Sequence, residues 1–109
     1  MSSEKRIEIL KSYILKDPKD FFSKYALSLE FIAGNRDEEA IVLLKEIIQA
    51  NPQYLPAYYQ LGKLMEKYNN AEEAIIVYEQ GMEVAREQYD TKTYNELSQA
   101  VDGIRMNEE

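Results

Sequence analysis

Residues 55–81 read LPAYYQLGKLMEKYNNAEEAIIVYEQG and contain two short amphipathic segments with a break between them. Apolar residues recur every three or four positions in both segments, which gathers their side chains on one face of a helix. The pair Asn69-Asn70 separates the segments, because Asn tolerates the left-handed conformation that ends a helix and its side chain can cap the next one. The stretch therefore predicts a helical hairpin.

The same pattern occurs 34 residues earlier in the chain. Eight positions are identical after this shift: Pro18, Tyr25, Leu27, Asn35, Glu38, Glu39, Ala40 and Ile41 align with Pro52, Tyr59, Leu61, Asn69, Glu72, Glu73, Ala74 and Ile75. A fixed period of this length with helix-turn-helix content is typical of alpha-solenoids. The hairpin over residues 55–81 is therefore one of two repeats.

Residues within these repeats resemble the tetratricopeptide repeat family. The second repeat matches the family pattern at Tyr58, Leu61, Gly62, Ala74 and Tyr78, and the first matches it at Leu27, Phe31, Ala40 and Pro52. The resemblance implies a small, stand-alone two-repeat protein of this family. Its expected fold is an all-α alpha-solenoid of two helix-turn-helix repeats with one flanking helix at each end.

One domain over residues 1–109 is expected. It would hold an N-terminal helix over 3–16, repeat one over 18–51, repeat two over 52–90 with an extended second helix, and a C-terminal capping helix over 93–106. Gly34 is expected to take the left-handed conformation after the first helix of repeat one, and Asn35 with Glu38 to cap the second helix. Thr93 with Glu96 is expected to cap the last helix in the same way.

Composition excludes several functional classes. The chain has no Cys and no His, so thiolate or histidine metal sites, disulfides and imidazole catalysis are excluded, and no cofactor is expected. Carboxylates and Lys neighbours such as Glu66 and Lys63 are most simply solvated ion pairs, so no enzyme activity is expected. The net charge of −7 disfavours nucleic acid as a ligand. Without a long apolar run or a secretory leader, no membrane association and a cytoplasmic location are expected.

Candidate binding residues follow from the resemblance. In tetratricopeptide proteins the first helices of successive repeats line a concave groove that receives a peptide. Carried over to this chain, the groove residues are Phe22, Tyr25, Leu29 and Ile32 from repeat one and Tyr59, Lys63 and Lys67 from repeat two. The Lys, Asn and Arg side chains with which chaperone-binding members clamp a terminal carboxylate are replaced here, for example by Tyr25 and Leu29, so that activity is not expected.

Three interpretations of these apolar residues remain open. The first helix of repeat one, FFSKYALSLEFIAG, is apolar on almost every side, so it must be covered from more than one direction. The cover could be a protein or peptide partner held by aromatic anchors. It could instead be a second copy of the chain in a homodimer. In the third interpretation the N-terminal helix folds across this face and its aromatics are ordinary core.

Overall fold

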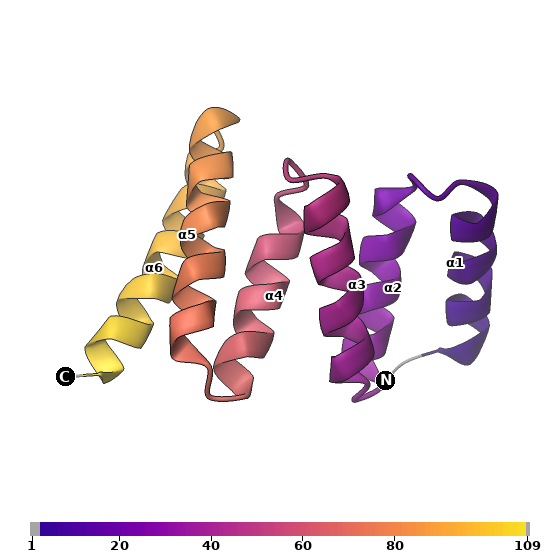
Figure 1. Cartoon of the computed structure of the whole chain (residues 1–109), viewed down its shortest axis with the longest axis horizontal. Helices are drawn as coiled ribbons and strands as arrows, with labels where there is room; N and C mark the ends of the chain where they lie inside the picture. Colours follow the sequence, from indigo (N-terminus) through magenta and orange to yellow (C-terminus); the bar gives the residue numbers. More distant parts are fainter. Residues whose placement is uncertain (1–2, 109) are drawn as a thin grey trace. The chain divides into compact units, whose positions relative to one another are not determined.

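The computed structural model of the chain describes residues 3–108, which form six α-helices and no strand (Figure 1). The helices are α1 (Glu4–Lys16), α2 (Phe21–Ala33), α3 (Asp37–Ala50), α4 (Pro56–Lys67), α5 (Ala71–Glu87) and α6 (Thr91–Asn107). They divide into two compact units, Met1–Tyr54 and Leu55–Glu109. In each unit the second helix packs against both others, α2 against α1 and α3, and α5 against α4 and α6.

The hairpin of α4 and α5 is built around small residues where the helices meet. A Cβ atom on Gly81 of α5 would stand 2.7 Å from the Cβ atom of Tyr58 on α4, so only a glycine permits this approach. The fully buried Tyr78 donates a hydrogen bond from its hydroxyl to the carboxylate of Glu66. Burial raises the pKa of Tyr78, and the Glu66 carboxylate adds to this effect. The phenol therefore stays neutral and ties α5 to α4.

The turns after α2, α4 and α5 share one backbone arrangement. Each contains a residue with positive φ: Asn35 at 61°, Asn69 at 60° and Tyr89 at 58°. The N–H of the residue that follows then bonds back five positions, with N–O distances of 2.8, 2.9 and 2.9 Å for Arg36, Asn70 and Asp90. This six-to-one bond satisfies a carbonyl left open at the helix end.

Two turn predictions are wrong in detail. Gly34 has a φ of −94°, so the left-handed residue is Asn35 and not the glycine. Asn35 also does not cap α3, because the capping position falls on Arg36, whose side chain makes no capping hydrogen bond. The cause is the six-to-one hydrogen bond from the Arg36 N–H to the Phe31 carbonyl. In this arrangement the left-handed residue is Asn35, one position after Gly34.

The predicted capping box at the last helix is also wrong. Asp90 caps α6, and its carboxylate accepts from the backbone N of Thr93 at 3.0 Å and from the Thr93 hydroxyl at 2.7 Å. The helix therefore begins at Thr91, two residues before the expected start at 93. Asp20 caps α2 through the same pair of contacts with Ser23, at 3.0 and 2.6 Å. A charged acceptor three residues ahead of a hydroxyl thus decides both helix starts.

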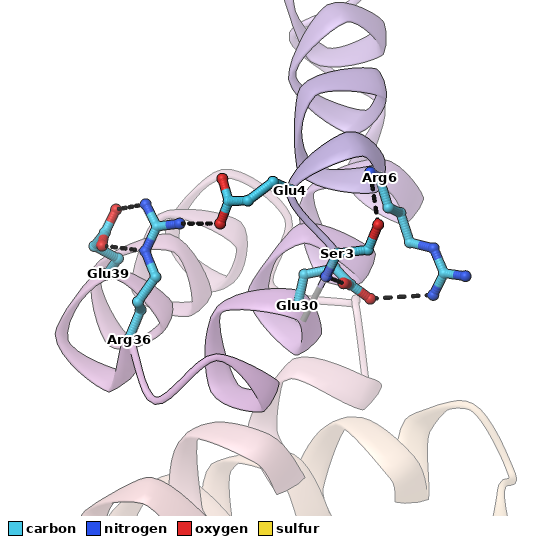
Figure 2. A network of polar contacts seen from close by, with 6 residues as sticks. All are labelled: Ser3, Glu4, Arg6, Glu30, Arg36 and Glu39. Carbon is cyan, nitrogen blue, oxygen red and sulfur yellow. Dashed lines mark hydrogen bonds and ion pairs between the residues drawn. The ribbon is translucent and has the colours of Figure 1, made fainter. Parts of the chain in front are cut away.

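A polar network fixes the start of α1 to the hairpin of α2 and α3 (Figure 2). Ser3 caps α1, because its hydroxyl accepts from the N–H of Arg6 at 3.2 Å. The backbone N–H of Ser3 donates to Glu30 of α2 at 2.9 Å, and the Arg6 guanidinium reaches the same carboxylate at 3.2 Å. Arg36, at the start of α3, lies between Glu4 of α1 at 3.6 Å and Glu39 of α3 at 2.7 Å (Figure 2).

Candidate functional site

The predicted binding residues of repeat one lie along one side of α2. We call Phe22, Tyr25, Leu29 and Ile32 the α2 face; their spacing of three, four and three residues places them in one row. Phe22 is 74% exposed and Leu29 37% exposed, while Tyr25 and Ile32 are half-buried. The interpretation in which α1 covers these aromatics is therefore wrong for Phe22. The helix uses its other side for packing, where Leu27 and Phe31 are buried.

An aromatic cluster holds the first turns of α2. The rings of Phe21 and Tyr25 lie 6.4 and 5.7 Å from the ring of Tyr54, the last residue of the same unit. Burial raises the pKa of Tyr54, and the neighbouring Tyr25 and Asp20 raise it further. The Tyr54 hydroxyl is therefore neutral. Hydrogen bonds from Ser23 lower the pKa of the capping Asp20, which favours the charged cap. Tyr25 therefore occupies a fixed position in which one side of its ring is already packed.

The predicted residues of repeat two lie along one side of α4. We call Tyr59, Lys63 and Lys67 the α4 face; successive members are four residues apart. The half-buried Tyr59 ring packs 6.2 Å from Tyr78, and the Nζ atom of Lys63 lies 5.8 Å from the centroid of the Tyr59 ring. The Nζ atom of Lys67 is also 5.8 Å from the Tyr68 ring. This face combines aromatic surface with two exposed ammonium groups.

Sequence reasoning missed Tyr54 and Tyr68 as members of these surfaces. Tyr54 lies between helices, outside the periodic pattern, and Tyr68 follows the last residue of α4. In the sequence, the only hint of a role for Tyr54 is its position two residues after Pro52, which aligns with Pro18. That spacing does not reveal that the Tyr54 ring contacts Phe21 and Tyr25. The structure thus places four predicted residues together on α2 and three together on α4.

Two other kinds of site are absent from the described part of the chain. No group of three or more acidic side chains within residues 3–108 is arranged to hold a metal ion. None of the helices α1–α6 combines the length and apolar character needed to cross a bilayer.

Comparisons with known proteins give a consistent family. The tetratricopeptide repeat family model matches residues 32–92. A tetratricopeptide repeat domain protein from Salinibacter ruber, solved by NMR, is 39% identical, covers 81% of this chain and 89% of its own, and superposes with a TM-score of 0.77. A crystal structure of a tetratricopeptide repeat domain protein from the same organism is 37% identical, covers 79% of this chain and 97% of its own, and has a TM-score of 0.76.

A protein from Bordetella parapertussis shares the fold, with a TM-score of 0.80 at 18% identity over 98% of this chain and 91% of its own. A comparison with curated proteins gives no match. The predicted fold class, an all-α alpha-solenoid of tetratricopeptide repeats, is confirmed by the six helices and these relatives. The chain belongs to the tetratricopeptide repeat family.

Proposed function

We propose that this chain is a protein-interaction module in which the α2 face of the first unit and the α4 face of the second unit each offer a surface to a protein or peptide partner. Tetratricopeptide repeats generally mediate interactions between proteins. The observation that carries the proposal is Phe22, a large aromatic side chain that remains 74% exposed in a row with Leu29. Aromatic side chains supply much contact area for little loss of conformational entropy, and they dominate the binding energy of many interfaces.

The two faces favour different chemistry in the partner. The α2 face offers only apolar and aromatic surface, so it suits apolar side chains. On the α4 face, Lys63 is exposed beside the Tyr59 ring and suits a carboxylate. The net charge of −7 opposes a strongly acidic partner. The expected ligand is therefore an apolar segment for the α2 face and an acidic group for the α4 face. This role needs neither catalysis nor a cofactor, and we assign it to the cytoplasm.

Selection from a displayed random-peptide library tests the proposal. Selected peptides are synthesised, and their dissociation constants are measured with the wild type, Phe22→Glu, Tyr59→Glu and the control Ile76→Glu. Ile76 is 49% exposed on α5 and belongs to neither face. Loss of an aromatic anchor should weaken binding by about tenfold or more, which is the range of interface hot spots. Peptides that bind Phe22→Glu and Tyr59→Glu as tightly as Ile76→Glu would remove the proposal.

A second candidate function is self-association through the α2 face. The exposed Phe22 and Leu29 form an apolar surface that could meet its own copy across a two-fold axis. Light scattering over a range of protein concentrations distinguishes the two functions. A homodimer would show twice the mass of the chain and would revert to a monomer in Phe22→Glu or Tyr25→Glu. A monomer at every concentration leaves the partner-binding function alone.

A further inference from the structure

A hollow lies between α2 and α3, on the other side of α2 from the α2 face. Its volume is about 440 Å³, within the size range of ligand-binding pockets. The lining consists of apolar residues framed by carboxylates: Leu27, Phe31, Val42 and Leu43 with Glu38, Glu39 and Glu46. We call this surface the α3 groove. Phe31 is two residues from Leu29, about 200° around the helix, so the α3 groove is separate from the α2 face.

Apolar surface is accessible in the α3 groove. Val42 is 58% exposed and Leu43 is half-buried, whereas Leu27 and Phe31 form a buried floor. Val42 is flanked on the same side of α3 by the exposed side chains of Glu38 and Glu46. The groove therefore offers an apolar contact at its centre, between charged groups.

The charged residues that line the α3 groove are acidic. Glu38 and Glu46 are both exposed, and neither forms an ion pair with any residue in the described range 3–108. Glu39 differs, because the Arg36 guanidinium binds it at 2.7 and 2.9 Å (Figure 2). Arg36, with a smaller contribution from Lys11 of α1, lowers the pKa of Glu39. Two carboxylates thus remain available to a cation from outside.

Arg36 shows how a cation fits at one end of this groove. Its guanidinium carbon lies 4.6 Å from the centroid of the Phe31 ring while its nitrogens bind Glu39. The chain therefore already pairs one basic side chain with a carboxylate above the apolar floor. A partner that places a cation at Glu38 or Glu46 would repeat this arrangement.

We propose that the α3 groove binds an amphipathic helix of a protein partner, with an apolar side chain against Val42 and a Lys or Arg at each of Glu38 and Glu46. These three residues are spaced four apart along one ridge of α3, so the two carboxylates are about 12 Å apart along the axis. Residues four apart on a partner helix have the same spacing along its axis. The ridge that they form can pack into the groove beside the ridge of α3. The recognised pattern is thus a basic residue, an apolar residue four positions later, and another basic residue four positions after that.

A synthetic peptide tests this proposal on the full chain. The probe is an Ala-rich helix, crosslinked on its outer side, with one Leu and a Lys four residues before and after it; a matched peptide carries Glu at both Lys positions. Titration of ¹⁵N-labelled protein should give saturable shifts at residues 38–46 with the Lys peptide only. The double variant Glu38→Lys/Glu46→Lys should weaken binding by about tenfold, and added salt should weaken it further.

The control variant Glu87→Lys/Glu96→Lys makes the same change in net charge at exposed sites on α5 and α6. It should bind within about twofold of the wild type, because it leaves the carboxylates of Glu38 and Glu46 in the α3 groove unchanged. Equal weakening in both double variants would mean attraction to overall charge, and would overturn the proposal. No saturable shift at about 1 mM peptide would also overturn it. So would loss of binding in Phe22→Glu with shifts on α2, because the peptide would then occupy the α2 face.

Discussion

Gly62 of α4 lies directly against the ring of Tyr78 of α5. A Cβ atom built on Gly62 would stand 2.2 Å from the Cε1 atom of Tyr78 and 2.6 Å from its Cδ1 and Cζ atoms. These distances are far below van der Waals contact, so either the ring or the helix would have to move. Tyr78 has little freedom to move, because it is fully buried and hydrogen-bonded to Glu66.

Gly62→Ala is therefore expected to destabilise the protein by about 1–3 kcal/mol, the usual cost of overpacking a tight core. This loss would appear although alanine is the better helix former by about 1 kcal/mol. Urea unfolding followed by circular dichroism measures the change. Replacing the ring in Gly62→Ala/Tyr78→Leu should recover part of the stability relative to Gly62→Ala. A stability equal to or above wild type in Gly62→Ala would contradict the contact.

Gly103→Ala is expected to have the opposite effect. Gly103 lies inside α6, and a Cβ atom there would meet nothing within 4 Å. Only the backbone effect then remains, so the substitution should raise the free energy of unfolding by about 0.5–1 kcal/mol. The same urea titration provides the measurement. A loss of stability would show that something packs against this position.

Tyr89→Asn is expected to stabilise the protein by about 1 kcal/mol. Tyr89 has a φ of 58°, a conformation that asparagine accepts more readily than a large aromatic residue. Its side chain is 93% exposed, so little packing is lost with the ring. Tyr89→Ala keeps a strained Cβ and should leave the midpoint of thermal unfolding nearly unchanged. An equal gain in stability in Tyr89→Asn and Tyr89→Ala would mean that removal of the ring, and not relief of backbone strain, causes the effect.

Glu30 should contribute to the acid sensitivity of the fold. The Ser3 backbone N–H, with help from Arg6 and against a desolvation effect, lowers the pKa of Glu30 below its ordinary value of 4.5. The stability from ionised Glu30 is therefore present above pH 4.5 and is lost as the pH falls through the lower pKa of the folded state. Glu30→Gln should be less stable than wild type at neutral pH and should converge with it in acid. Glu96→Gln on α6 is the control, and a gap that persists in acid would contradict this origin.

The 34-residue period predicted the helices well, because it records which side chains pack between helices. Pro56 begins α4 as expected, since proline fits the first helical position. The turns were less predictable. Asn35 and Asn69 take left-handed positions that asparagine favours, but Tyr89 takes the equivalent position without that preference, so the six-to-one hydrogen bond accompanies all three turns.

The surfaces were predicted only in part. The row from Phe22 to Ile32 follows from helical spacing and the family resemblance, whereas the contacts of Tyr25 with Tyr54 depend on a segment outside any helix. The α3 groove could not be predicted, because Val42 fits the apolar pattern of a core residue in the sequence. Its 58% exposure appears only once Ala40, Leu44 and Ile47 are seen to occupy the buried side of α3.

The most direct measurement of the central claim is chemical-shift mapping of ¹⁵N-labelled protein with a selected peptide. The partner-binding account predicts the largest changes on one of the two faces, either at the amides of Phe22, Tyr25, Leu29 and Ile32 on α2 or at those of Tyr59, Lys63 and Lys67 on α4. Changes confined to α5 and α6, with the amides of α2 unmoved at saturation, would contradict it.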